Sequence, residues 1–185
     1  MARLPYADPD RVSEPVREAL AAVPPLNVFR MTANAETAFR PWLRFGGALL
    51  SSLELDARVR ELVILHVARL SGAEYERVQH VPIALAAGAT ERELAAVESG
   101  DLESDALGDA ERAVLRFTTE VVQDVRASDD ALAAVVEAGF SPREIVELVL
   151  VIGQYMMVAR VAETAGIELD EPAAVSESAE RGRRS

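Results

Sequence analysis

Patterns typical of β-strands are almost absent from this sequence, and that absence limits the possible folds more than any other feature. Aromatic residues make up 5% of the 185 residues. No alternating apolar and polar runs lie between hairpin-forming dipeptides. Ala, Leu, Glu and Arg, which favour helices, dominate the composition instead. The sequence therefore predicts an all-α fold.

Apolar spacing predicts where the helices lie. Segment 56–70 carries apolar residues around much of its helical circumference, so we expect it to be buried at the centre of the domain. Asn27 is placed to cap a short helix that carries Phe29 and Met31. The other expected helices span 10–23, 35–51, 73–87, 91–99, 109–126, 129–138 and 142–165.

Two segments 51 residues apart are similar, namely 87–94 (AGATEREL) and 138–145 (AGFSPREI). Each predicts a helix that ends at Gly, followed by an N-cap Thr90 or Ser141 with Glu three residues later. The similarity has two interpretations. It is either a duplicated helix-turn-helix unit or a favourable local signal that arose twice.

The composition excludes several chemistries. Cysteine and lysine are both absent, which rules out disulfides, thiolate nucleophiles and Schiff-base lysines. Two histidines, the carboxylates and three tyrosines remain as acid/base groups. The net charge of −12 disfavours nucleic acid and anionic membrane partners, so a small molecule or a protein is the better expectation.

Neither a secretory signal nor a membrane span is expected. Residues 1–10 lack the apolar core of a signal peptide. The most apolar stretch, 145–159, is shorter than a span and is interrupted by Glu147 and Gln154, so it predicts a buried helix. We therefore expect a cytoplasmic protein.

His80 is the stronger of the two histidine candidates for catalysis. Glu76 precedes it by one helical turn, and a carboxylate within hydrogen-bond reach would fix the ring tautomer and raise its basicity. His66 lies among apolar residues, as packed histidines do. Glu61 is either an exposed first-turn glutamate or a buried, paired one, and both readings stay open. A metal would need further ligands, so no metal or cofactor is predicted.

Segments 60–65 (RELVIL) and 72–80 (GAEYERVQH) resemble the carboxymuconolactone decarboxylase family, which includes the alkyl hydroperoxidase D-like proteins. The flanks 24–30, 141–144 and 152–155 are similar to the same family. The resemblance implies a helical domain over 25–170 that assembles as homo-trimers or homo-hexamers. Residues 1–24 would form an N-terminal helical extension. The composition of 171–185 predicts a disordered tail.

The hydroperoxidase branch of this family carries a Glu, a Cys-x-x-Cys pair and a His at fixed spacing. In this sequence these positions fall on Glu61, on Ala73 and Glu76, and on His80. The Glu and His match, but both cysteines are missing, so the resemblance does not carry thiol peroxidase activity here. The decarboxylase branch also lacks the pair and has a Glu six residues before the His, which corresponds to Glu74.

We therefore expect a cofactor-free acid/base enzyme that decarboxylates, isomerises or hydrolyses a small carbonyl or lactone carboxylate. His80 would move the proton, oriented by Glu76, and Glu61 would complete the relay. Glu74 or Tyr75 would be a second proton donor, and Arg30 would bind the substrate anion. Two alternatives remain: a non-catalytic oligomeric binding protein, and a hydroperoxide-related oxidoreductase that uses an external thiol or another redox centre.

Overall fold

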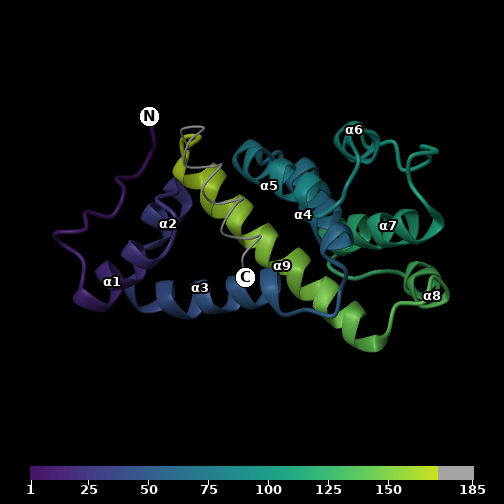
Figure 1. Ribbon diagram of the computed structural model, residues 1–185, viewed down its shortest axis with the longest axis horizontal. Coiled ribbons are helices and arrows are strands. Elements are labelled where there is room, and N and C mark those ends of the chain that lie inside the picture. The colour runs from purple at the N-terminus through teal and green to yellow at the C-terminus, as the bar shows by residue number, and fades with distance from the viewer. Residues whose placement is uncertain (171–185) are drawn as a thin grey trace. The chain divides into compact units, whose positions relative to one another are not determined.

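The computed structural model describes residues 1–170, and this part of the chain is helical without strands (Figure 1). The prediction of an all-α fold is confirmed. The expected tail, 171–185, lies outside the described residues. The helices are α1 (Glu14–Ala22), α2 (Asn27–Thr32), α3 (Glu36–Ser51), α4 (Ala57–Ser71), α5 (Glu74–Ala86), α6 (Glu91–Ser99), α7 (Asp109–Asp124), α8 (Asp129–Glu137) and α9 (Pro142–Ala165).

The chain groups into two compact units. Among the described residues, the first contains 1–52 and 160–170, and the second contains 53–159. All of the residues that matter for the site below, except Arg30, belong to the second unit. The predicted domain boundary at residue 24 is a separate matter and stays a prediction.

Helix α4 is the core of the second unit, as its apolar pattern predicts. Asp56 caps its start by accepting a hydrogen bond from the Val59 amide at 3.0 Å. Gly72 ends it with a φ of 65°, a conformation that glycine adopts without strain. Every residue from Val59 to Ala68 is buried. Helices α5, α6 and α7 pack around α4 (Figure 1).

Small and branched apolar side chains fill the space between these helices. Leu62 and Leu65 of α4 contact residues of α5, α6 and α7 in one buried cluster. Complete burial of such side chains is the main stabilising contribution to a helical core. The other buried members are Ala84, Ala89, Leu94, Ala96, Val97, Leu107 and Leu115.

Both copies of the repeated segment adopt the expected local structure. Gly88 and Gly139 have φ values of 98° and 97°. Thr90 and Glu93 form a reciprocal capping box at the start of α6. At the start of α9, the Ser141 amide donates to Glu144 Oε2 at 2.8 Å and the Glu144 amide donates to Ser141 Oγ at 3.2 Å. The local signal is therefore real in both places, and a wider duplication stays a prediction.

The prediction that Asn27 caps the short helix in the first unit is wrong. Asn27 is the first residue of α2 and not its N-cap, which is Leu26. Its side-chain amide instead donates to the Glu168 carbonyl at 3.1 Å, and its backbone amide donates to Asp170. Long-range partners thus take the polar groups that a local cap would have used.

Glu147, one of the two polar residues that interrupt the apolar stretch of α9, has a structural role. Glu147 Oε2 accepts hydrogen bonds from the backbone amides of Glu54 and Leu55, each at 2.9 Å, so this carboxylate joins α9 to the chain before α4. By length and composition alone α9 could cross a membrane, a test that core helices of soluble proteins also pass. The expectation of no membrane partner stays a prediction.

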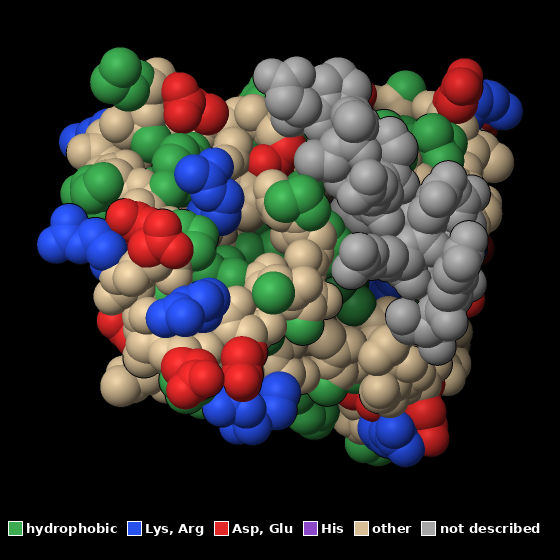
Figure 2. Space-filling model, turned by 60° about the vertical axis from the view of Figure 1, so that its left-hand side comes forward, with side chains coloured by type: hydrophobic (Ala, Val, Ile, Leu, Met, Phe, Trp, Pro, Cys, Tyr) green, Lys and Arg blue, Asp and Glu red, His purple; other side chains and the backbone are tan. Residues whose placement is uncertain are grey.

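The surface mixes charges of both signs. On the face shown in Figure 2, Asp and Glu side chains lie interspersed with Arg side chains, so the acidic excess does not make this face uniformly negative. Several ion pairs within residues 1–170 join two exposed side chains, and such pairs contribute little to stability.

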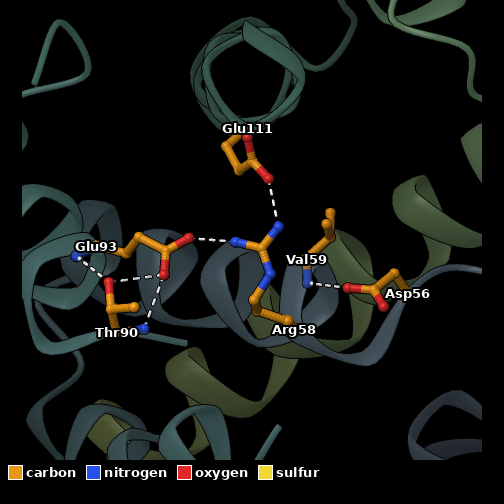
Figure 3. A network of polar contacts seen from close by, with 6 residues as sticks. All are labelled: Asp56, Arg58, Val59, Thr90, Glu93 and Glu111. Carbon is orange, nitrogen blue, oxygen red and sulfur yellow. Dashed lines mark hydrogen bonds and ion pairs between the residues drawn. The ribbon is translucent and has the colours of Figure 1, made fainter. Parts of the chain in front are cut away.

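Arg58 forms less exposed ion pairs that join three helices (Figure 3). From α4, its guanidinium pairs with Glu93 of α6 and with Glu111 of α7. The side chain of Glu93 is 8% exposed and that of Glu111 is 13% exposed. Glu93 is also part of the capping box with Thr90, so the network couples a helix start to the core helix.

Replacement of Arg58 by Met should lower the free energy of unfolding by about 2 kcal/mol, because it leaves two poorly solvated carboxylates without their cation. The matched control is Arg92→Met, which breaks an exposed pair with Asp105 and should cost less than about 0.5 kcal/mol. Urea unfolding of the three proteins measures both values. Equal effects of the two substitutions would contradict a structural role for the network.

Candidate functional site

The turn between α4 and α5 brings Glu61 and His80 together. His80 Nδ1 lies 2.7 Å from Glu61 Oε2, and this contact is buried. Glu61 is 0% exposed and His80 is 7% exposed. Of the two readings that the sequence left open for Glu61, the structure therefore shows the buried and paired one.

Arg60 holds the other oxygen of the same carboxylate. Its Nε and Nη2 atoms each lie 2.9 Å from Glu61 Oε1. The Arg60 side chain is 9% exposed, which makes this a buried ion pair. Because Arg60 occupies Oε1, the orientation of Oε2 toward His80 is fixed.

The charge of Glu61 follows from these contacts. Burial raises its pKa, but the charges of His80 and Arg60 and their hydrogen bonds lower it by more, so the pKa of Glu61 lies below its usual value. Glu61 is therefore an ionised carboxylate in the folded protein at neutral pH.

An ionised Glu61 determines which nitrogen of His80 carries the proton. A carboxylate only accepts hydrogen bonds, so Nδ1–H must donate to it. In neutral His80 the lone pair then lies on Nε2, for which no hydrogen bond to a described residue is found. This is the arrangement of a general base that a carboxylate orients.

Tyr155 of α9 lies beside His80, although the sequence did not predict it as a site residue. Its ring meets the His80 ring edge to face, with 4.8 Å between the centroids and 89° between the planes. Burial raises the pKa of Tyr155 well above its usual value, and the charges of Glu61 and Glu76 raise it further. Tyr155 is thus a neutral phenol beside His80. No spacing rule connects residues 75 positions apart, so only the fold shows this pair.

The other residues expected on α5 separate into two groups. Glu76 and Tyr75 are buried, at 2% and 3% exposure, and Glu76 lies one turn before His80. Glu74 is exposed and pairs with Arg77 at 2.7 Å, so the structure does not bring it to the Glu61–His80 contact. The orienting contact on Nδ1, expected from Glu76, comes from Glu61.

Arg30 belongs to the first unit. Its guanidinium donates to Asn27 Oδ1 at 3.1 Å and lies over the Tyr6 ring at 4.6 Å from the centroid. These contacts account for its position within that unit. Its expected role in substrate binding stays a prediction.

A cleft of about 290 Å³ lies where α4 ends and α5 begins. Ala73, at one of the two positions where the hydroperoxidase branch would have cysteine, is part of its wall, together with the exposed Glu74–Arg77 pair. Within residues 1–170 no cluster of three or more His, Cys, Asp or Glu side chains could hold a metal ion.

His66 is buried but lies outside this arrangement. Its Nε2 is 2.7 Å from Thr119 Oγ1, whose own proton goes to the Leu115 carbonyl at 2.9 Å. Nε2–H is therefore the donor, and Nδ1 is buried without a hydrogen-bond partner in the described chain. Burial, followed by the charge of Arg69, lowers the pKa of His66 to about 4. His66 is a neutral packing residue.

Replacement of His66 by Gln should change how stability depends on pH. The unfolded chain takes up a proton near pH 6.5 and the folded one near pH 4, so stability is lost as pH falls between these values. From pH 7 to pH 5 the unmodified protein should lose about 2 kcal/mol more than the variant. Urea unfolding at both pH values measures the difference. An identical pH dependence in the two proteins would contradict a neutral, buried His66.

Residues 36–120 match the sequence model of the carboxymuconolactone decarboxylase family. No curated protein matches the chain. A structure from Ralstonia eutropha JMP134, described as an alkylhydroperoxidase AhpD core and an uncharacterized peroxidase-related protein, superimposes with a TM-score of 0.81 at 20% identity. The match covers 92% of this chain and 93% of that one.

Two further structures are similar. A peroxidase-related protein from Silicibacter sp. TM1040 has a TM-score of 0.78 at 16% identity, with 91% and 92% of the two chains covered. A protein of unknown function from Agrobacterium tumefaciens, described as a putative antioxidant defence protein AhpD, has a TM-score of 0.68 at 25% identity. That match covers 75% of this chain and 95% of that one. The fold is therefore AhpD-like.

Proposed function

We propose that the protein is an enzyme that uses acid/base chemistry on a small carbonyl or lactone carboxylate, because residues 36–120 match the sequence model of the carboxymuconolactone decarboxylase family. The observation that carries the proposal is the hydrogen bond of 2.7 Å between His80 Nδ1 and Glu61 Oε2, which leaves Nε2 as a base. Isomerisation needs a base that moves a proton between carbons, hydrolysis needs a base that activates water, and decarboxylation needs a group that delivers a proton to the carbanion left by CO₂.

In the proposed reaction, His80 Nε2 removes a proton from the carbon next to the substrate carbonyl. The electron pair of the broken C–H bond forms the C=C bond of an enolate, and the π electrons of the carbonyl move onto its oxygen. The imidazolium that forms is stabilised by Glu61. His80 then returns the proton to the same or another carbon. Because burial raises its pKa, Tyr155 keeps its proton at neutral pH and can donate a hydrogen bond to the carbonyl oxygen as that oxygen gains negative charge.

The buried contact favours this proposal over a non-catalytic module. A binding or assembly role does not require an ionised carboxylate and a histidine to meet inside the protein, and burial of such a pair costs free energy. An oxidoreductase role has less support, because Ala73 and Glu76 stand where a thiol peroxidase would have its cysteines. The similar structures are described as peroxidase-related, and that description applies to those proteins.

The proposal includes a small-molecule substrate, a cytoplasmic location and assembly as a homo-trimer or homo-hexamer. Helix α9 offers an observation in favour of assembly. Val146, Val149, Leu150 and Met157 lie on one side of the helix and are 41–59% exposed. Contiguous apolar side chains in contact with water often mark a protein–protein interface.

Replacement of Leu150 by Glu should lower the number of chains in the assembly, because it puts a charge in the apolar stripe of α9. Leu132→Glu is the matched control, since Leu132 is similarly exposed, at 42%, but lies on α8. Light scattering after size exclusion measures the mass of each protein. If the unmodified protein runs as a monomer, assembly is excluded.

Replacement of His80 by Gln should abolish proton transfer while the helical circular dichroism spectrum stays unchanged, and Glu61→Gln should slow it by about 100-fold or more. Incorporation of deuterium from D₂O into a panel of β-keto acids and γ-lactone carboxylates reports the C–H step directly by NMR. Glu74→Gln is the matched control, because Glu74 is exposed and paired with Arg77. Its rate should equal that of the unmodified protein.

Two outcomes would contradict the proposal. One is undiminished exchange in the His80→Gln variant, which would remove His80 from the reaction. The other is the absence of both exchange and turnover for the unmodified protein across the panel, which would exclude this substrate class.

A further inference from the structure

The cleft of about 290 Å³ in the second unit contains a cation that no described residue neutralises. It lies where α4 ends, α5 begins and α6 ends. Neither Glu61 nor His80 is part of its wall, so it is separate from their contact. The charged residues that line it are Arg69, Glu74, Arg77 and Glu98.

One arginine holds both carboxylates of the cleft. Arg77 donates to the two oxygens of Glu74, from Nη2 at 2.7 Å and from Nε at 2.8 Å. Its Nη1 atom donates to Glu98 Oε1 at 3.1 Å. These three side chains satisfy one another, which leaves Arg69 as the fourth charged group.

The guanidinium of Arg69 has neither an ion pair nor a hydrogen bond to another residue within 1–170. It lies against Gly100, the residue at which α6 ends. A Cβ atom at residue 100 would be 2.7 Å from Arg69 Nη1 and 2.9 Å from its Cζ, so the absence of a side chain makes room for the guanidinium. The N–H groups of Arg69 are therefore open to a ligand in the cleft.

We propose that this cleft binds a small monocarboxylate and that Arg69 binds its carboxylate group. A guanidinium presents two parallel N–H groups whose geometry matches the two oxygens of a carboxylate. Leu65, Ala68 and Ala73 supply an apolar part of the wall, against which the body of the ligand can pack. The volume is at the lower end of the range for ligand sites, which limits the ligand to a small molecule.

The two glutamates of the cleft favour a monocarboxylate over a phosphate. Glu74 and Glu98 line the same space as Arg69, and each further negative charge on a ligand would be repelled by them. Inorganic phosphate carries more negative charge at neutral pH than a monocarboxylate and has no apolar body. It should therefore compete poorly for the cleft.

The test is a titration of the full chain with 4-fluorobenzoate at neutral pH, followed by ¹⁹F NMR. The matched neutral compound is 4-fluorobenzamide, which has the same ring and no charge. Arg69→Met removes the guanidinium, and Arg69→Gln removes it but keeps an N–H donor. Both variants should keep the helical circular dichroism spectrum, because Arg69 is exposed. Arg92→Met is the matched control protein, since Arg92 is an exposed cation of α6 that pairs with Asp105 outside the cleft.

The unmodified protein should bind 4-fluorobenzoate with a Kd in the millimolar range. Arg69→Met and Arg69→Gln should each weaken binding by about tenfold or more, because they remove a charge-assisted bidentate contact. Arg92→Met should bind as the unmodified protein does. The unmodified protein should bind 4-fluorobenzamide about tenfold more weakly or worse, and inorganic phosphate should fail to displace 4-fluorobenzoate at equal concentration.

Three outcomes would overturn the inference. The first is the absence of saturable binding of 4-fluorobenzoate to the unmodified protein. The second is equal affinity of the unmodified protein and both Arg69 variants. The third is a loss in Arg92→Met as large as in Arg69→Met, which would show an effect of overall charge and not of the cleft.

The inference does not rest on the proposed function, and His80→Gln separates the two. That variant should bind 4-fluorobenzoate as tightly as the unmodified protein, whether or not it catalyses exchange. A loss of binding in His80→Gln with full binding in both Arg69 variants would place the carboxylate beside His80 and overturn the role of Arg69. Binding that depends on Arg69, with no exchange of any panel compound, would uphold the cleft and reject the enzyme.

Discussion

The buried carboxylate of Glu61 is the group on which the candidate site depends. Ionised carboxylates are rarely buried without partners, because the loss of hydration costs several kcal/mol. Here Arg60 and His80 each take one oxygen, and that division of the carboxylate offsets the cost. The hydrogen bond to Glu61 also fixes the tautomer of His80, with the proton on Nδ1. Stability and chemistry are thus coupled, because removal of either Arg60 or His80 leaves the buried charge of Glu61 with one partner fewer.

This coupling explains why α4 must be the central helix. A carboxylate can be held in this way only on a helix whose surroundings exclude water, and α4 is buried from Val59 to Ala68. Its ends are fixed by the Asp56 cap and by Gly72, after which α5 begins almost at once. Arg58 then ties the first turn of α4 to α6 and α7. Rigid elements on both sides of the hairpin limit how far the Glu61–His80 contact can open.

The fold was largely predictable from the sequence, because its helix signals are local. Helices α6 and α9 have the expected bounds, and the expected burial of α4 is confirmed. The prediction for Asn27 was wrong because its hydrogen-bond partners are not local. Its backbone amide donates to Asp170 and its side-chain amide donates to Glu168, and both partners lie more than 140 positions away. The site was predictable only where its residues lie close together on one helix. Glu76 and His80 share a helical face and could be paired by spacing, whereas Glu61 could be buried or exposed until the packing of α4 was known.

Tyr155 is a neighbour of His80 that sequence spacing could not predict, and it matters for the proposed reaction. A neutral phenol against the edge of an imidazole has no local signature, because α9 reaches His80 only through the tertiary fold. Its presence changes the chemical capacity of the site, since a base that removes a proton from carbon needs a group that can receive the developing negative charge elsewhere. Glu61 cannot do this, because it is anionic and already holds Arg60 and His80. A phenol whose pKa is raised by burial keeps its proton and can donate a hydrogen bond without giving up that proton. The pair of a carboxylate-oriented base and a permanently protonated donor is therefore better suited to proton transfer at carbon than to thiol chemistry, for which the chain has no sulfur nucleophile.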